Sequence, residues 1–230
     1  MWSVDVARLF AGALAANPDL HMIVVVPRYP DVDGAFALPP NLVGREQALE
    51  VCHRAGGERV HVFDVENHAG TPVYVHAKVC VVDDTWASVG SDNFNRRSWT
   101  HDSELSSTVL DTTRDPREPR DPAGTGEGAR TFARDLRLAL AREHLDLAAD
   151  GSEDDELLDP ARFVDVLNER SAALDAWHEG GRRGPRPPGR LREHRPDKLS
   201  WFARLWATPV YRLLDDPDGR PLRLRLKKEF

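Results

Sequence analysis

The chain has 230 residues, of which 40% are hydrophobic and 30% charged, a composition typical of a soluble globular protein. No apolar run approaches the roughly 20 residues needed to cross a bilayer. The first residues also lack the basic and then apolar start of a secretory signal. We therefore expect a cytoplasmic protein. Cys52 and Cys80 have no metal-ligand spacing, and both are expected to be reduced.

Charge is unevenly distributed along the chain. The net charge is −7, yet residues 181–230 hold 14 Lys and Arg against 6 Asp and Glu. The first 180 residues therefore hold 17 basic and 32 acidic side chains. A protein that binds nucleic-acid backbones is usually basic near its site. Because the candidate site described below lies in the acidic part, we expect no nucleic-acid partner.

Hydrophobic periodicity predicts alternating helices and strands in the first 110 residues. The expected helices cover 4–16 and 45–55, and the expected strands cover 20–26, 59–65 and 105–110. A loop rich in Pro, Asp and Gly over 27–40 is long enough to border a site. Together with the hairpin described below, this order predicts an α/β fold in which a mixed β-sheet is flanked by helices.

The rest of the chain is expected to be helical and irregular. The predicted elements are amphipathic helices over 129–149 and 161–177, a basic Pro/Gly-rich linker without regular structure over 180–196, and an edge strand over 222–226. We therefore divide the chain into a catalytic half-domain over 1–150 and a C-terminal extension over 151–230, which contains the second helix, the linker and an aromatic tail.

The stretch from Val73 to Glu104 holds the residues suited to chemistry. Residues 73–82 alternate like a buried strand, and a side-chain period of two places His76 and Lys78 on one face, where both can address one anion. Asp83 has the opposite parity. It would lie roughly 23 Å from His76 along an extended strand, so it cannot be the carboxylate that orients the imidazole.

The next strand is expected to bring polar groups back to the histidine. A two-residue turn of aspartates after Val82 would place Ser91, at the end of the returning strand, opposite His76. Gly90 permits close backbone approach, and Ser91 and Asn93 would add neutral hydrogen-bond donors. The hairpin therefore predicts a phosphate-binding site that contains a titratable nitrogen.

The order of these residues resembles the signature of the phospholipase D superfamily. The pattern is His76-x-Lys78-x4-Asp83, then Gly90-Ser91-x-Asn93, then Arg97-Ser98. It is specific because it fixes many residue types over one short stretch, unlike a lone His-x-Lys pair. The alternative is a buried hairpin whose polar residues only satisfy one another.

The resemblance implies a role for each residue. The implied catalytic residues are His76, Lys78, Asp83 and Glu104. The implied phosphate ligands are Lys78, Ser91 and Asn93. Within these sets Asp83 would be mainly structural. Glu104 would hydrogen-bond the histidine and fix its tautomer, and Asp102 is the alternative residue nearby for that role. The resemblance implies no metal and no cofactor.

The resemblance is to the C-terminal half of bacterial two-motif phospholipase D proteins. In that family one histidine attacks phosphorus, and a second protonates the leaving alcohol and then activates water or an acceptor alcohol. Among the nine histidines of this chain only His76 has a lysine two residues later, and its position suggests the general acid. A homodimer, or a missing N-terminal half with a second motif, would complete the site.

The implied substrate is a phospholipid head-group ester, which would be hydrolysed or transferred to an alcohol. The alternatives are a catalytically silent remnant that binds phosphodiesters or serves as an interaction module, and a nuclease of the same superfamily, which the acidic charge disfavours. In the tail, aromatic residues such as Trp201, Phe202, Trp206 and Tyr211 interleave with arginines. They suit either an anionic membrane surface, contacted peripherally, or docking on the domain.

Overall fold

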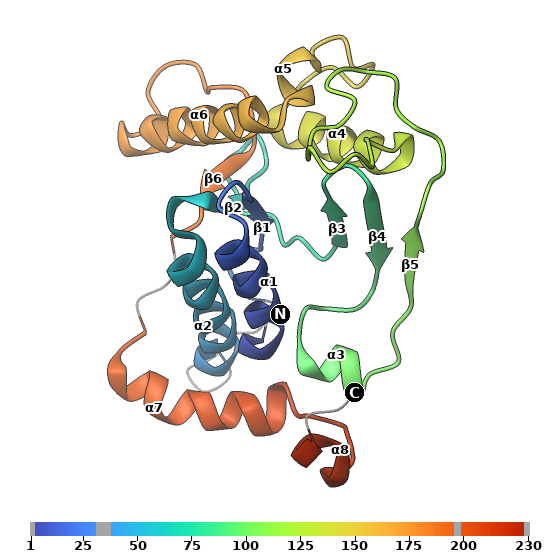
Figure 1. Ribbon diagram of the computed structural model, residues 1–230. Helices are drawn as coiled ribbons and strands as arrows, with labels where there is room; N and C mark the ends of the chain where they lie inside the picture. Colours follow the sequence, from blue (N-terminus) through green and yellow to red (C-terminus); the bar gives the residue numbers. More distant parts are fainter. Residues whose placement is uncertain (1–2, 31–37, 196–198, 228–230) are drawn as a thin grey trace.

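The computed structural model of the chain describes residues 3–30, 38–195 and 199–227 (Figure 1). The helical elements are α1 (Val4–Ala16), α2 (Leu38–Gly56), η1 (Gly57–Arg59), α3 (Arg96–Thr100), α4 (Thr131–Leu145), α5 (Asp155–Leu158), α6 (Pro160–Glu179), α7 (Trp201–Val210), η2 (Tyr211–Asp215) and α8 (Leu222–Lys227). The strands are β1 (Met22–Val25), β2 (Val60–Val65), β3 (Lys78–Val82), β4 (Trp86–Gly90), β5 (Ser106–Val109) and β6 (Leu191–Glu193). The predicted α/β class is confirmed. Much of the loop predicted over 27–40 lies outside the described residues, and its last residues begin α2.

The first sheet has β2 at its centre. β1 pairs with β2 in parallel, Ile23 beside His61, and β6 pairs with it antiparallel, Leu191 beside Val65. The sequence of β2 is mostly apolar, and five of its six residues are buried, as expected of a strand whose two faces are both covered. The expected mixed sheet is therefore present, but it contains only these three strands.

The second sheet is an antiparallel meander of β3, β4 and β5. Two aspartates with φ of 52° and 54° form the turn after Val82, as predicted. Thr85, which follows them, is not part of the β-ladder. Val82 therefore lies beside Trp86 rather than beside Thr85. The predicted register is wrong by one residue, and Gly90 lies opposite Lys78.

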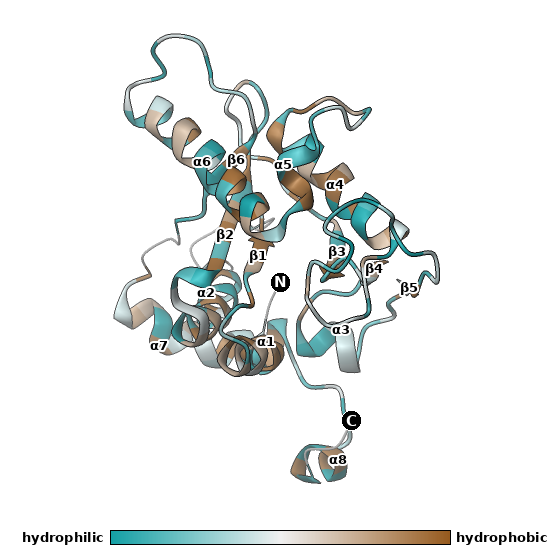
Figure 2. Cartoon of the chain, turned by 45° about the horizontal axis from the view of Figure 1, so that its top comes forward, coloured by the Kyte–Doolittle hydropathy of each residue, from teal (hydrophilic) through white to brown (hydrophobic). Residues whose placement is uncertain are grey.

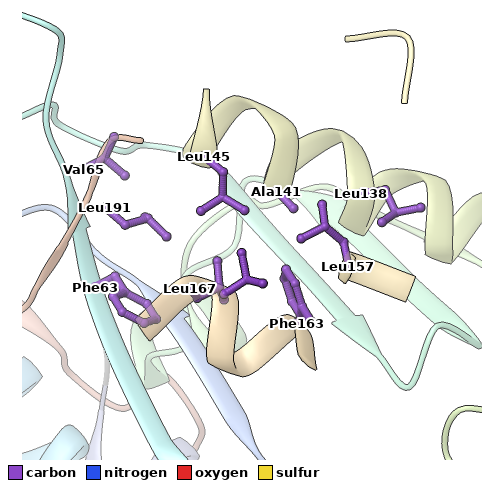
Figure 3. Packing of buried hydrophobic residues seen from close by; sticks show 10 residues of the cluster. Phe63, Val65, Leu138, Ala141, Leu145, Leu157, Phe163, Leu167 and Leu191 are labelled. Carbon is purple, nitrogen blue, oxygen red and sulfur yellow. The ribbon is translucent and has the colours of Figure 1, made fainter. Parts of the chain in front are cut away.

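The largest hydrophobic cluster joins the first sheet to helices from both predicted parts of the chain (Figure 3). Its members include Phe63, Val65 and Leu191 from the sheet, Leu138, Ala141 and Leu145 from α4, and Phe163 and Leu167 from α6. α6 and β6 belong to the predicted C-terminal extension, which begins at residue 151. Their side chains nevertheless pack in the same core as those of β2. A second cluster packs α1 and α2 against the sheet and includes Cys52, whose pKa is raised by burial to about 11. Cys52 and Cys80 are both free thiols, as predicted.

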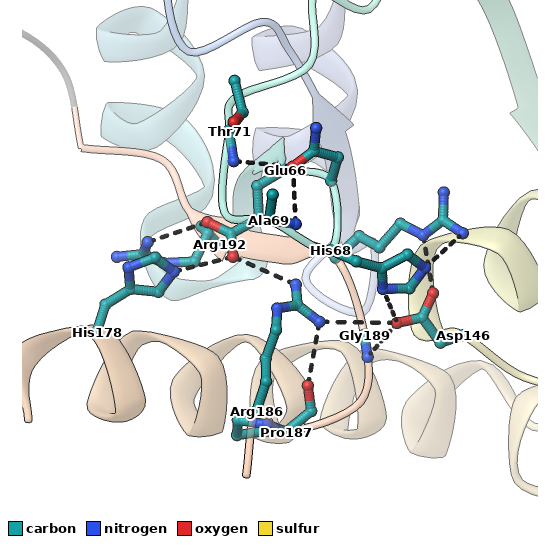
Figure 4. Close-up of polar contacts among 12 residues, drawn as sticks. Glu66, His68, Ala69, Thr71, Asp146, His178, Arg186, Pro187, Gly189 and Arg192 are labelled. Atoms are coloured by element: carbon teal, nitrogen blue, oxygen red, sulfur yellow. Dashed lines mark hydrogen bonds and ion pairs between the residues drawn. The ribbon is translucent and has the colours of Figure 1, made fainter. Parts of the chain in front are cut away.

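Part of the basic segment predicted as a linker over 180–196 is held against the first sheet, within its described residues 180–195, so the prediction of an irregular linker is wrong for that part. β6 adds backbone hydrogen bonds to β2, and the guanidinium groups of Arg186 and Arg192 both pair with the fully buried carboxylate of Glu66 (Figure 4). His178 of α6 contacts the same carboxylate at 2.9 Å. The partner of Arg186 lies 120 residues earlier, so local composition could not reveal it.

The C-terminal end packs on α2. α7 begins at the cap Ser200 and, with η2, buries Ala207 and Tyr211 against Val43. The edge strand predicted over 222–226 is wrong, because this segment forms α8. Over the described residues, no helix combines the length and apolar character needed to cross a bilayer.

Candidate active site

His76 and Lys78 meet where the chain enters β3. The strand begins at Lys78, five residues later than predicted, so His76 lies in the extended approach to the strand. The Lys78 ammonium donates a hydrogen bond to the backbone carbonyl of His76 at 2.7 Å. The His76 imidazole is exposed and stacks on Tyr74, with ring centroids 5.9 Å apart. The lysine and the histidine are therefore adjacent, and the imidazole is accessible.

Gly90 allows the second sheet to close beside Lys78. It lies opposite Lys78 on β3 and opposite Ser106 on β5. A Cβ atom added at Gly90 would lie 1.9 Å from the Ser106 hydroxyl and 2.7 Å from the Ser106 Cα. Only glycine fits this position without moving backbone, because real Cβ atoms do not approach other atoms so closely.

Glu104 is held by two serine hydroxyls. Ser91 Oγ donates to Glu104 Oε2 at 2.6 Å, and Ser98 Oγ donates to Oε1 at 2.7 Å. These hydrogen bonds lower the pKa of Glu104, since they favour the ionised carboxylate. Burial lowers the pKa of Lys78, and the nearby charge of Glu104 opposes that shift. Ser91, Lys78 and Glu104 therefore lie at the same end of the hairpin.

The expected hydrogen bond between Glu104 and His76 is not formed in this structure. Both carboxylate oxygens accept from serines instead. The rival, Asp102, accepts from Arg97 Nε at 2.7 and 2.8 Å. Neither acid therefore orients the His76 imidazole here.

Ser98 is the site residue to which the sequence reasoning gave no role. Its hydroxyl accepts from the Asn93 backbone N–H at 3.2 Å while it donates to Glu104. Its own N–H is capped by the Asn95 side chain at 2.8 Å, at the start of α3. Ser98 consequently joins the Gly-Ser-x-Asn segment to the acid, and the Arg97-Ser98 part of the motif was the available signal.

A shallow depression of about 380 Å³ opens on the acid side of this network. Its lining residues are Asp92, Ser98, Trp99, Glu104 and Ser106. The exposed His76 imidazole is not among them, so this depression does not include the histidine.

The two turn aspartates lie at the far end of β3 from His76. Asp83 has a raised pKa, caused by burial and then by the charge of Asp84. Asp84 is buried and pairs with Arg134 at 3.1 Å and with Arg137 at 2.6 Å, both on α4. The expectation that Asp83 does not orient His76 agrees with this placement, and Asp84, which the sequence reasoning left without a role, fastens the hairpin to α4.

Comparison with known families points to the same stretch of chain. Residues 41–114 match a family model described as cardiolipin synthase, PLD-like domain. This segment is therefore similar to a phospholipase D-like domain. This match spans β2, the hairpin, α3 and β5, and so it includes the whole network around Glu104.

Curated phospholipases D align with part of this phospholipase D-like chain. Phospholipase D1 of Schizosaccharomyces pombe is 41% identical over 90 residues, which is 37% of this chain and 6% of that protein. Phospholipase D zeta 1 of Arabidopsis thaliana is 40% identical over 95 residues, 40% of this chain and 8% of its own length. Phospholipase D1 of Mus musculus is 39% identical over 124 residues, 52% and 11% respectively. The chain thus aligns with a small part of each relative.

Replacing Gly90 by alanine should loosen the phospholipase D-like hairpin. The added methyl group collides with the backbone of Ser106, so β5 must move and carry Glu104 with it. We expect a loss of about 1–3 kcal/mol in the free energy of unfolding, in the range of other overpacked sites. Gly12→Ala is the matched control, since a Cβ there meets nothing within 4 Å. Equal urea midpoints for the two variants would contradict the close approach.

Proposed function

We propose that this chain supplies one half of a phospholipase D-type site that cleaves, or transfers to an alcohol, the head-group ester of a phospholipid. The observation that carries the proposal is the clustering of Lys78, Ser91 and Glu104 beside an exposed His76, within the segment that matches the family. The protonated Lys78 and the amide of Asn93 would bind the phosphoryl oxygens, because both can donate hydrogen bonds to an anion.

His76 would act as the general acid. In the proposed reaction an imidazole from a second motif attacks phosphorus, the P–N bond forms, and the bond from phosphorus to the leaving oxygen breaks. His76 gives its proton to that oxygen. Afterwards it accepts a proton from water or from an acceptor alcohol, whose oxygen attacks phosphorus, so that a new P–O bond forms, the P–N bond breaks and the nucleophilic imidazole is freed. Glu104 would keep a negative charge beside Lys78 and thereby preserve its positive charge.

Phosphodiester cleavage by the full chain tests the proposal. We expect turnover of phosphatidylcholine to exceed turnover of DNA, and to survive EDTA because the proposed acid, nucleophile and phosphate ligands are all side chains. Activity that EDTA abolishes and a divalent cation restores would contradict the histidine mechanism. Faster cleavage of DNA would favour the nuclease alternative. Binding of a phosphodiester without turnover would identify a silent half-site.

Assembly follows from the single motif. If the chain is active alone, two copies should meet about a two-fold axis so that each contributes His76 and Lys78 on opposite sides of one phosphorus. The two ammonium groups would repel each other until a phosphoryl group lies between them, so phosphate or vanadate should stabilise the dimer by mass action. Sedimentation velocity with and without vanadate measures this. An active chain that stays monomeric at assay concentration would refute the shared site, and an inactive monomer would point to a separate half with the second motif.

A further inference from the structure

The C-terminal helical elements expose an extensive hydrophobic surface. On α7, Trp201, Phe202 and Leu205 have 76%, 62% and 66% of their surface exposed. The remaining members, on η2 and α8, are Leu213, Leu214, Leu222 and Leu226. Single exposed apolar side chains are ordinary, but seven of them within residues 201–226 exceed isolated exposure, and large exposed apolar patches occur at protein or membrane contacts. We call these seven residues the C-terminal apolar surface.

α7 is hydrophobic on both sides, and the domain covers only one of them. Ala207 is fully buried against α2, whereas Trp201 and Phe202 pack edge to face on each other, with ring centroids 6.0 Å apart. Arg204 is held by Glu46 of α2 at 3.3 Å, which fixes the orientation of the helix. The structure therefore decides the question left open by the sequence: Trp206 and Tyr211 dock on the domain, and Trp201 and Phe202 face outward.

The charges around the C-terminal apolar surface are mainly positive. The exposed cations are Arg212, Arg223, Arg225 and Lys227. Two of the acidic residues of the segment are turned inward or paired: Asp216 is fully buried beside Tyr211, and Asp218 is bound by Arg220 at 2.7 Å. The third, Asp215, is half-buried. In Figure 2, hydrophobic and hydrophilic residues are mixed along α8. Aromatic and aliphatic side chains among cations fit the interface of a membrane that contains anionic lipid.

The loop between η2 and α8, which connects two parts of the C-terminal apolar surface, is hydrogen-bonded to α3 of the candidate active site. Asp216 accepts a hydrogen bond from the Arg97 backbone N–H at 2.7 Å and lies 3.5 Å from Arg96 Nε. The Gly219 N–H donates to the Thr100 hydroxyl at 2.9 Å. The partners Arg96, Arg97 and Thr100 all belong to α3, the helix that also contains Ser98. In Figure 1, α3, α7 and α8 all lie toward the lower end of the molecule.

We propose that α7, η2 and α8 form a docking surface for anionic lipid bilayers, which holds the neighbouring active site at the membrane. The role in presenting substrate rests on the proposed function, but binding to the bilayer does not. The outward aromatic and leucine side chains would enter the interfacial region, and the exposed cations would contact the lipid phosphates.

Sedimentation with vesicles tests the surface, in a His76→Ala background that removes turnover. The full chain should bind vesicles of equal parts phosphatidylcholine and phosphatidylglycerol better than pure phosphatidylcholine, and binding should weaken as salt rises. Changing Trp201, Phe202 and Leu205 together to serine should lower the partition coefficient by at least about tenfold. Changing Arg223 and Arg225 to glutamine should reduce only the preference for anionic vesicles. Leu110→Ser is the matched control, because Leu110 is 74% exposed and follows β5.

Equal binding by the triple variant and the unchanged chain would overturn the proposal, as would an equal loss in Leu110→Ser. A triple variant that loses self-association but keeps vesicle binding would assign the surface to a protein contact instead. The two proposals fail separately. Vesicle binding by the chain with His76 intact, but without any phosphodiester turnover, would leave the surface standing and contradict the proposed activity. Turnover of a soluble short-chain phospholipid by that chain without vesicle binding would do the reverse.

Discussion

His76→Ala should abolish phosphodiester turnover while leaving the fold intact. Loss of a general acid typically lowers the rate by about 10²–10⁴-fold. The imidazole is exposed and stacks on the Tyr74 ring, so we expect its removal to leave the core intact. The measurements are the hydrolysis rate, in whichever assembly proves active, and the thermal unfolding midpoint.

A surface histidine outside the motif provides the control. His53 is exposed on α2, and His53→Ala should keep both the rate and the unfolding midpoint. A residual wild-type rate in His76→Ala would remove that residue from the mechanism. A shared loss of rate in both variants would indicate a general effect of histidine substitution rather than a catalytic role for His76.

Asp84→Asn should be strongly destabilising. Its carboxylate is buried and pairs with Arg134, whose side chain is 0% exposed, and with Arg137. Because the amide removes the carboxylate that pairs with Arg137 and leaves Arg134 with only Asp115 at 3.5 Å among the described acidic side chains, we expect a loss of about 3 kcal/mol in the free energy of unfolding. Asparagine tolerates the positive φ of this turn, so backbone strain does not contribute. Urea denaturation measures the loss.

Asp83→Asn is the matched control, since Asp83 has nearly the same φ in the same turn. Its pKa is raised in the folded chain by burial and by the charge of Asp84. A raised carboxyl pKa means that stability falls as pH rises through the ordinary titration range of the group, because the fold disfavours the ionised form. The neutral amide removes this penalty, so stability at pH 7 should stay equal or rise slightly. Equal losses in both variants would show that the turn, not the ion pair, limits stability.

Local periodicity was enough to predict the regular elements near the N-terminus. α1 has the predicted bounds because an apolar stripe and the Ser3 cap both lie within its own sequence. The hairpin was also predicted, but not its register. Two residues at positive φ would fit a two-residue turn. Thr85 joins that turn, because its backbone N–H and its hydroxyl both donate to the Val82 carbonyl, and this extra residue shifts the register by one.

The contacts of the candidate site depend on residues brought together by the fold. The type and position of Glu104 could be predicted from the motif, whereas its hydrogen bonds to Ser91 and Ser98 depend on where α3 places the second serine. The segment around Arg192 looked like a linker because its composition is basic and rich in Pro and Gly. Its order comes from Glu66 and Asp175, whose partners cannot be read from local sequence.

The place of β6 in the first sheet has a consequence for how the chain folds. β6 supplies one neighbour of the central strand β2, and contacts such as that between His194 and Asp64 join residues 130 positions apart. Closing so long a loop costs chain entropy before any pairing energy is gained, so such contacts form late in folding. On the ribosome, one edge of β2 would stay unpaired until residues near 193 emerge. Hydrogen exchange pulsed during refolding should therefore protect the β1-facing amides of β2 before the β6-facing ones.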